Sequence, residues 1–395
     1  MKYCVLIMDG AAGLPLPDYG GKTSLELART PNLDAMVKTG MVGLAHMVPK
    51  DMEPDSAVAC MSIFGYDPKV YYSGRAPIEA ISLNIPINPG EALFRCNLVT
   101  VQNGAMVSHS AGSISTAEAH ELVEALNKAL GNERIHICPG ISYRGILKLK
   151  GAVETTQAVC TPPHDIPDKL AAEYLPRGAG SKLLLDLMAH SQEVLKDHPV
   201  NKQRIARGDL PATSIWLFWG SSRIPTMPLF YETYHRKAAV TSGVNLLQGL
   251  GKMAGMAVLE ISGVTDGLDN NYAAQAKGAL DALKFYDIVI IHIEAPDEAG
   301  HTGSVKEKVA AIEKIDKLVV RQVRDWRGDG LRLLVTSDHP TPISIRTHTD
   351  APVPFLLWGA GFNPNGAKRL TESEAERTGL TINPGWNIMR RLIGE

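Results

Sequence analysis

Residues 288–303 of this chain read IVIIHIEAPDEAGHTG, an apolar run that gives way at once to acidic residues and a histidine. The run Ile288–Ile293 predicts a buried strand, because it is short and rich in β-branched residues. Asp297 and His301 follow it four residues apart, which places both side chains on one face of a helical turn. In open α/β sheets, ligands bind beyond the carboxyl ends of the strands. The stretch therefore predicts an α/β fold with metal-type ligands at one edge of the sheet.

Two other apolar runs end in the same kind of residue. Tyr3–Met8 is followed by Asp9, and Leu331–Thr336 is followed by Asp338 and His339. Each motif alone has a simpler explanation: an aspartate after a strand is usually a turn or a helix cap, an i,i+4 pair is often only solvated, and Asp-His before proline is ordinary loop sequence. Their repetition behind separate apolar runs nevertheless indicates a metal site.

His348 lies nine residues beyond His339 and completes the set of candidate ligands. Mixed carboxylates and imidazoles suit Zn, Mn or Co better than Ca, which prefers oxygen ligands almost alone. Mg competes through its availability. The number of side chains predicts two divalent ions. The candidate ligands are Asp9, Asp297, His301, Asp338, His339 and His348.

Short β-branched runs alternate with helical patterns at both ends of the chain and less regularly in the middle. This alternation predicts parallel βαβ units, so we expect a mostly parallel sheet. A chain of 395 residues exceeds what one hydrophobic core usually organises, and its middle part carries strands and helices of its own. We therefore predict a core domain formed by residues 1–76 and 236–395, split by a smaller inserted α/β domain at residues 77–235.

The hydrophobic patterns also predict individual elements. In the core we expect strands at Tyr3–Met8, 237–243, Ala257–Ile261, Ile288–Ile293, Leu331–Thr336 and Pro354–Trp358. Helices are expected near Leu33–Thr39, Asn245–Ala254, Tyr272–Phe285 and Val305–Trp326. In the insertion we expect strands at Ala92–Val101 and Gly145–Leu149 and helices at Thr116–Leu130 and Ser181–His198.

The composition is that of an ordinary globular protein, with 45% hydrophobic and 21% charged residues and a formal net charge of −2. No long run of like charges occurs, so neither nucleic acid nor an anionic membrane surface is an expected partner. The five cysteines form no Cys-x-x-Cys pair, and no signal-type or membrane-spanning segment is visible. We expect a reduced, cytoplasmic protein, whose oligomeric state the sequence does not indicate.

Longer motifs resemble one known family over essentially the whole chain. They are VLIMDG (5–10), GGKTSLELARTPNLDAM (20–36), DSAVACMSIFGYDP (55–68), YSGRAPIEA (72–80), EALFRCN (91–97), HIEAPDEAGHTG (292–303), TSDHPTP (336–342) and RTHTDAPVPFLLWG (346–359). The sequence resembles the archaeal-type cofactor-independent phosphoglycerate mutases of the alkaline phosphatase superfamily.

The resemblance implies an alkaline-phosphatase-like α/β core that is interrupted by a smaller domain and binds two divalent ions. It also implies interconversion of 3- and 2-phosphoglycerate through a phosphoserine at Ser56. By motif position, one ion is held by Asp297, His301 and His348, and the other by Asp9, Ser56, Asp338 and His339.

The chemistry of Ser56 agrees with this role, because a serine hydroxyl is a weak nucleophile unless a base or a metal ion activates it. The residue is also expected to cap the helix that begins DSAVACM. The two roles are compatible, since a helix N-terminus favours both a cap and a bound phosphate.

The inserted domain is expected to bind the rest of a small phosphorylated substrate. Arg75, Arg95 and Arg144 are candidates, since guanidinium groups bind carboxylate and phosphate in a bidentate manner. Each arginine is as readily explained by a surface salt bridge. His109 and His164 are further candidates, although an isolated histidine is as often a structural residue.

Two positions depart from the pattern of the mutases. Ser108–Ser110 stands where they usually carry an arginine-rich stretch, and Gln248 stands where they tend to have a lysine. The stretch around Ser108–Ser110 and the stretch SQEVLKDHPVN (191–201) resemble a bacterial branch that has been proposed to act as a homoserine kinase. A metal-dependent phosphotransferase of that branch or a phosphomonoester hydrolase therefore remains an alternative, as does a non-catalytic metal-binding or regulatory protein. No Walker A or kinase glycine-rich motif supports a common nucleotide site.

Overall fold

The computed structural model describes residues 1–394, whose contacts group into two compact units. Unit 1 comprises residues 1–72 and the residues from 226 onward, and unit 2 comprises residues 73–225. The sequence placed the insertion at 77–235, so the second boundary lies ten residues earlier in the structure. The reason is helix α9 (Phe230–Tyr234), which packs in unit 1: Phe230 is buried, and the Tyr234 hydroxyl donates to the Gly65 carbonyl oxygen at 2.7 Å.

Unit 1 is built on a sheet with the strand order β13-β2-β12-β11-β1-β10-β8-β9. The central strand β1 pairs in parallel with β10 and β11, and β8 pairs in parallel with β10 and β9. Among the described strands of this sheet, only β12 runs antiparallel to both of its neighbours, so the predicted, mostly parallel α/β sheet is confirmed. The strands are β1 (Lys2–Met8), β2 (Met41–Ala45), β8 (Ala238–Thr241), β9 (Ala257–Val258), β10 (Ile288–Ile293), β11 (Leu331–Thr336), β12 (Val353–Gly359) and β13 (Thr381–Ile382).

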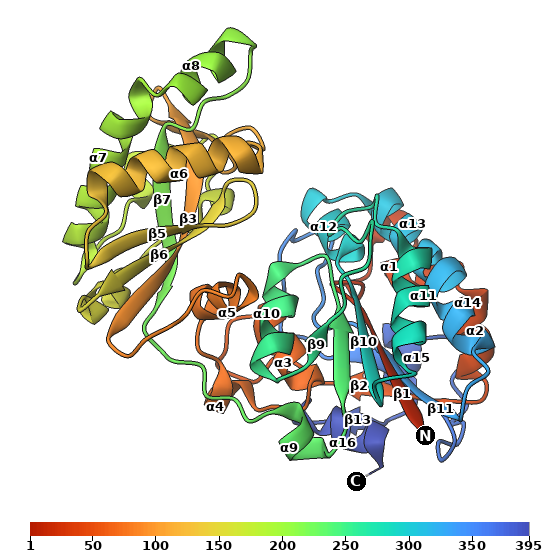
Figure 1. Cartoon of the computed structure of the whole chain (residues 1–395). Coiled ribbons are helices and arrows are strands. Elements are labelled where there is room, and N and C mark those ends of the chain that lie inside the picture. Colours follow the sequence, from red (N-terminus) through yellow and green to blue (C-terminus); the bar gives the residue numbers. More distant parts are fainter. Residues whose placement is uncertain (395) are drawn as a thin grey trace. The chain divides into compact units, whose positions relative to one another are not determined.

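Helices cover both faces of this sheet (Figure 1). On one face α11 packs on β8 and β10, next to α14 and α2; on the other, α10 packs on β8 and β9, and α3 contacts both α10 and α16. Because the central strands are buried on both faces, they read as continuous apolar runs. The helices and turns of unit 1, besides α9, are η1 (Pro17–Tyr19), α1 (Ser24–Leu27), α2 (Pro31–Val37), α3 (Ser56–Ile63), α4 (Pro68–Tyr71), α10 (Asn245–Met253), α11 (Tyr272–Ala282), α12 (Ala295–Thr302), α13 (Val305–Ile315), η5 (Asp316–Val320), α14 (Arg321–Asp325), α15 (Glu372–Arg377) and α16 (Asn387–Ile393).

Some elements of unit 1 differ from the sequence prediction. The predicted helix Val305–Trp326 contains a π-helical turn, η5, between α13 and α14. This turn begins at the buried Asp316, whose carboxylate accepts from the backbone amides of Asn32 at 3.2 Å and Leu33 at 2.8 Å. The irregular turn thus anchors the first turn of α2. Strand β9 is shorter than the predicted Ala257–Ile261, and β2 and β13 were not predicted.

Unit 2 has an antiparallel sheet in which β3 pairs with β4, β6 and β7, and β5 pairs with β6. Helices α6 and α7 pack on each other and on this sheet, and α5 contacts β3, β6 and β7. Their contacts bury a core that includes Phe94, Leu122, Leu184 and Trp216. The elements are α5 (Arg75–Ser82), β3 (Glu91–Gln102), β4 (Ala105–Ser108), α6 (Thr116–Leu130), β5 (Ile135–Pro139), β6 (Arg144–Lys150), η2 (Val153–Gln157), η3 (Pro163–Asp165), η4 (Ala171–Tyr174), α7 (Ser181–Lys196), α8 (Pro199–Ala206) and β7 (Ser214–Ser221).

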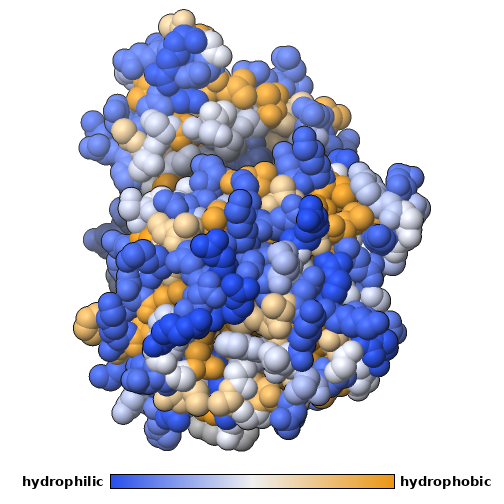
Figure 2. Space-filling model, turned by 90° about the vertical axis from the view of Figure 1, so that its right-hand side faces the viewer, coloured by the Kyte–Doolittle hydropathy of each residue, from blue (hydrophilic) through white to orange (hydrophobic). Residues whose placement is uncertain are grey.

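The surface is mainly polar on the face drawn in Figure 2, where apolar residues form separate small groups. Among residues 1–394, no helix combines the length and the apolar character that crossing a membrane requires. The cysteines are free thiols, and Cys4, Cys60 and Cys96 are buried.

Candidate metal centre

The first group of predicted ligands forms where β10 leads into α12. Asp297 and His301 lie one turn apart on α12, and His348 comes from the loop between β11 and β12. The His301 Nε2 atom lies 3.0 Å from Asp297 Oδ2 and 3.0 Å from His348 Nε2. His348 Nε2 lies 3.5 Å from Asp297 Oδ1. The three side chains thus direct one donor atom each toward a common point, as ligands of a single ion would.

The outer nitrogens of the two histidines show which atoms face this point. His301 Nδ1 lies 3.0 Å from the Arg346 carbonyl oxygen, and His348 Nδ1 lies 3.3 Å from the Pro54 carbonyl oxygen. A carbonyl oxygen only accepts, so each Nδ1 carries its hydrogen and the neutral ring keeps a lone pair on Nε2. Burial lowers the pKa of His301, but the hydrogen bond and charge of Asp297 and the hydrogen bond to the Arg346 carbonyl together outweigh burial and raise the pKa to about 9. An ion bound here therefore competes with a proton.

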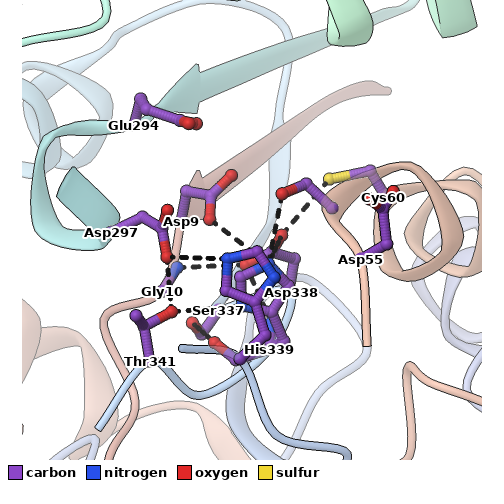
Figure 3. A network of polar contacts seen from close by, with 12 residues as sticks. Asp9, Gly10, Asp55, Cys60, Glu294, Asp297, Ser337, Asp338, His339 and Thr341 are labelled. Carbon is purple, nitrogen blue, oxygen red and sulfur yellow. Dashed lines mark hydrogen bonds and ion pairs between the residues drawn. The ribbon is translucent and has the colours of Figure 1, made fainter. Parts of the chain in front are cut away.

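The second group lies at the ends of β1 and β11. His339 Nε2 lies 3.1 Å from Asp338 Oδ2 and 3.7 Å from Asp9 Oδ1, and all three residues are fully buried. The His339 ring stacks on the His348 ring with a centroid distance of 3.8 Å. The two groups are therefore adjacent, and Figure 3 shows Asp9 after β1, Asp297 on α12, and Asp338 and His339 after β11 pointing toward one another.

Hydrogen bonds orient this second group. Asp338 Oδ1 accepts from the backbone amides of Gly10 at 3.1 Å and His339 at 2.8 Å, which leaves Oδ2 toward the His339 ring. The Thr341 hydroxyl donates to the Asp297 carboxylate, so its oxygen accepts from His339 Nδ1, 3.3 Å away. As in the first group, the Nε2 lone pair of the histidine then faces the other ligands.

Ser56 is the first residue of α3, and its Oγ lies 3.2 Å from His339 Nε2. The residue that caps the helix is Asp55, whose side chain accepts from the Ala57 amide at 2.7 Å. The expectation that Ser56 itself is the cap is wrong. Because Asp55 occupies the cap position, the Ser56 hydroxyl is left to face the second ligand group, at a helix end that favours anions.

The charge of the centre fits bound cations. Burial, together with the carboxylates of Asp338 and Glu294, raises the pKa of Asp9 well above its usual range. Within the described residues, the buried Asp9 Oδ1 has no hydrogen-bond partner. Burying a carboxylate oxygen without a partner costs folding free energy, and a divalent ion would remove that cost.

Lys308 of α13 is fully buried and is not among the residues predicted from the sequence. Its Nζ donates to the carbonyl oxygens of Ala12 at 3.1 Å and Thr341 at 2.6 Å, so it joins the loops that follow β1 and β11. Burial lowers its pKa to about 8. Lys308 precedes the buried Ala311 and Ile312 by three and four residues. A lysine within an apolar stripe at helical spacing was therefore a signal in the sequence.

Gly10 separates the two ligand groups. Its φ is +59°, and a Cβ added there would lie 2.4 Å from Asp297 Oδ1 and 2.6 Å from Thr341 Oγ1. We expect Gly10→Ala to lower the free energy of unfolding by at least about 2 kcal/mol, because strain and a clash combine, and to weaken ion binding by displacing Asp297. Urea unfolding and metal content measure the two effects. Gly20→Ala is the matched control, since Gly20 has a φ of +66° but nothing within 4 Å of the added atom. If Gly10→Ala and Gly20→Ala lower the free energy of unfolding equally, the close contact of the added Cβ with Asp297 and Thr341 does not contribute.

In unit 2, two of the predicted substrate residues share one carboxylate. Glu79 accepts from Arg75 Nε at 3.1 Å and from Arg95 Nη1, and Arg95 Nη2 donates to Asn97 Oδ1 at 3.2 Å. The Arg75 guanidinium lies 4.1 Å from the centroid of the Trp219 ring. Arg95 and Glu79 are buried, so the surface-salt-bridge explanation is wrong for Arg95.

The other predicted substrate residues of unit 2 lie around neighbouring rings. The His109 ring centroid is 6.2 Å from that of His164 and 5.7 Å from that of Tyr143, and the Arg144 guanidinium lies 5.0 Å from the Tyr143 centroid. His164 is also 5.4 Å from Trp219, which connects this set to Arg75. Burial, followed by the positive charge of Arg144, lowers the pKa of His109.

Known proteins are similar to this chain over its whole length. The model of a family described as 2,3-bisphosphoglycerate-independent phosphoglycerate mutase matches residues 37–201. Proteins with that name from Methanothrix thermoacetophila and Methanosarcina acetivorans are 46% and 42% identical, each over 100% of both chains. The chain belongs to this family.

Two solved structures are similar to this chain, and one of them is named a phosphoglycerate mutase. A protein from Pyrococcus horikoshii matches with a TM-score of 0.82 at 28% identity, covering 100% of this chain and 97% of the other. The cofactor-independent phosphoglycerate mutase from Thermoplasma acidophilum matches with a TM-score of 0.64 at 27% identity, covering 100% and 99%. The resemblance inferred from the motifs is therefore confirmed.

Proposed function

We propose that this member of the family is a 2,3-bisphosphoglycerate-independent phosphoglycerate mutase that interconverts 3- and 2-phosphoglycerate through a phosphorylated Ser56. The observation that carries the proposal is the position of Ser56 Oγ in the first turn of α3, 3.2 Å from His339 Nε2 and beside the ligand groups. The substrate is supported by full-length relatives that carry the mutase name.

We assign two divalent ions to the centre, with Mn, Zn, Co and Mg as candidates. The convergent Nε2 lone pairs and the unpartnered oxygen of Asp9 support this assignment. When bound, the ions would neutralise charge on the phosphoryl oxygens and lower the pKa of a coordinated hydroxyl. One ion is assigned to Asp297, His301 and His348, and the other to Asp9, Ser56, Asp338 and His339.

In the proposed reaction, Ser56 Oγ loses its proton and bonds to phosphorus while the bond from phosphorus to the substrate O3 breaks. O3 takes up a proton, which gives glycerate and phosphoserine. The glycerate 2-hydroxyl then loses its proton and its oxygen bonds to phosphorus while the bond from phosphorus to Ser56 Oγ breaks. Ser56 Oγ takes up a proton, which gives 2-phosphoglycerate and the free serine. The N-terminal end of α3 stabilises the phosphoserine in between.

We assign the arginines of unit 2 to the anionic groups of the substrate. Arg75, Arg95 and Arg144 supply guanidinium donors that match carboxylate and phosphate oxygens. Glu79 holds Arg75 and Arg95 in fixed orientations through the contacts described above. Burial raises the pKa of Glu79, but the charges and hydrogen bonds of Arg95 and Arg75 lower it by more. The pKa therefore lies below its usual value. Glu79 therefore stays charged and keeps both cations in place.

The purified protein with added Mn²⁺ and 3-phosphoglycerate tests the proposal directly. We expect 2-phosphoglycerate to form without added bisphosphoglycerate and to reach equilibrium with the substrate. Parallel assays for phosphate release and for phosphoryl transfer from ATP to homoserine separate the alternatives. Turnover in either of these assays without mutase conversion would overturn the proposal in favour of a hydrolase or a kinase-like enzyme.

Gln248 separates the mutase from the kinase-like alternative. Its Nε2 donates to the Ser242 carbonyl oxygen at 2.9 Å, so the amide already has a structural partner. We expect wild-type protein to be a robust mutase and Gln248→Lys to bring no gain in kcat, because the new cation would replace that contact. If the wild-type protein has weak mutase activity and Gln248→Lys raises it, the absence of a cation at position 248 limits the mutase reaction. That result would support the kinase-like alternative. Gln248→Met, which removes the amide without adding charge, is the control.

A further inference from the structure

His292 is a fourth histidine at the centre, and its contacts differ from those of the three assigned ligands. It occupies the penultimate position of β10 and is 1% exposed. Its Nε2 lies 2.6 Å from Asp9 Oδ2, and its Nδ1 lies 2.9 Å from Ser242 Oγ. In His301, His339 and His348, Nδ1 faces an acceptor outside the ligand groups and Nε2 faces inward.

The hydrogens around His292 can be placed from these contacts. The Val244 amide donates to Ser242 Oγ at 3.0 Å, so the hydroxyl hydrogen of Ser242 is available for His292 Nδ1. A carboxylate only accepts, so Nε2 must donate to Asp9. One neutral tautomer, with its hydrogen on Nε2, therefore satisfies every one of these polar atoms. It is the opposite tautomer to that of the three ligand histidines.

Asp9, His292 and Glu294 are also close enough together to be considered as a separate cation site. The distances speak against it. The nitrogen–oxygen separations within the assigned ligand groups include 3.0, 3.1 and 3.5 Å, which leave room for an ion, whereas His292 Nε2 and Asp9 Oδ2 are 2.6 Å apart. That separation is a hydrogen bond from a ring nitrogen to a carboxylate.

We propose that His292 is a positioning residue that holds Asp9 for ion binding, with its tautomer set by Ser242. The inference rests on the proposed role of Asp9 as a ligand. Because His292 holds Oδ2, the other oxygen, Oδ1, is turned toward His339, 3.7 Å away. In Figure 3 the carboxylate of Asp9 has one oxygen on the side of Asp338 and His339, joined to the network drawn there. Such partners outside the ligand set fix the orientation and basicity of a ligand.

Two glutamines form hydrogen bonds with the backbone of Ser242 and His292. Gln248 Nε2 donates to the Ser242 carbonyl oxygen at 2.9 Å, and Gln275 Nε2 donates to the His292 carbonyl oxygen at 2.9 Å. Gln275 is itself fully buried and accepts from Asn270 at 2.8 Å. Side chains of α10 and α11 thus hold the backbone of Ser242 and His292. Ser242 Oγ and Asp9 Oδ2 contact the two ring nitrogens, which leaves the imidazole little freedom to turn.

Ser242→Ala tests the proposal with the smallest change. It removes the hydrogen bond to Nδ1 and so frees the imidazole to take the other tautomer. We expect the affinity for one of two Mn²⁺ ions to fall about 10- to 100-fold while the other ion binds as in wild type. Equilibrium dialysis with metal analysis and Mn²⁺ EPR measure both sites. Ser191→Ala is the matched control, since Ser191 is a fully buried serine of unit 2 whose hydroxyl donates to the Met188 carbonyl oxygen and not to a histidine.

His292→Gln and His292→Leu form the second test. The glutamine amide nitrogen is as many bonds from Cβ as Nε2 and can donate to Asp9, so His292→Gln should keep both ions, whereas His292→Leu should lose one. Urea unfolding shows whether each variant is folded. Wild-type affinity at both sites in folded Ser242→Ala and His292→Leu overturns the proposal. A third ion in wild type that is lost in Glu294→Gln also overturns it, because His292 would then be a ligand. Ion binding is measured without phosphoglycerate, so a failed mutase assay does not decide this test.

Discussion

Ser56→Ala is expected to abolish the interconversion of phosphoglycerates, lowering kcat by about 10³-fold or more, because no other group can carry the phosphoryl group. The fold should persist, since Asp55 and not Ser56 caps α3. Asp297, His301 and His348 should still bind one ion, since Ser56 does not belong to that group. Stopped assays of both phosphoglycerates measure the loss of activity, and metal analysis measures the retained ion.

A matched control and a direct detection sharpen the Ser56 test. Ser62 is buried on the same helix, but its hydroxyl donates to the Met47 carbonyl oxygen at 2.6 Å, away from the ligand groups. Ser62→Ala should therefore keep most of the activity. Intact mass of wild-type protein quenched during turnover should show one added phosphoryl group, and peptide mapping should place it on Ser56. A phosphoprotein that persists in Ser56→Ala would contradict the proposed carrier.

Much of the fold was predictable because the central strands carry their own signal. The bounds predicted for Ile288–Ile293 and Leu331–Thr336 agree with β10 and β11. These strands are parallel and largely buried on both faces, so they read as apolar runs interrupted only by His292 in β10 and by Arg332 and Thr336 in β11, and ligands that follow them must meet at one edge. Strand β13 spans only Thr381–Ile382 at the sheet edge, which is too short for periodicity to reveal.

The arrangement around the ligands was less accessible from sequence. Asp9, Asp338 and His339 are brought together as expected, but the partners that orient them come from residues of ordinary appearance. His292 sits inside an apolar strand, and Lys308 lies on an apolar helix face. A polar side chain at such a position must find a buried partner, so each was a signal. The identity of the partner depends on the three-dimensional approach of loops far apart in sequence, which spacing does not give.

Removal of the ions is expected to affect both activity and stability strongly. A chelator is expected to abolish activity and to lower the free energy of unfolding, by about 2.7 kcal/mol for each ion that was present at 100 times its dissociation constant. The reason is the charge of the centre: without cations, burial and neighbouring carboxylates make ionised Asp9 unfavourable. Urea unfolding with and without chelator, followed by restoration with Mn²⁺, measures the difference.

Asp297→Asn tests whether the ions that the chelator removes are bound by the proposed ligands. Asp297 is buried, lies 3.0 Å from His301 Nε2 and 3.5 Å from His348 Nε2, and is the carboxylate of the first group. A neutral amide is a much weaker ligand for a divalent ion, so the variant should bind one ion fewer. Its kcat should fall by about 10³-fold or more, and the chelator should change its free energy of unfolding much less than that of wild type. Asp281→Asn is the control, because Asp281 pairs with Lys277 on the exposed surface of α11. If Asp297→Asn keeps both ions and the full chelator effect, the ions that stabilise the protein are bound elsewhere, and the assignment of the first group is wrong.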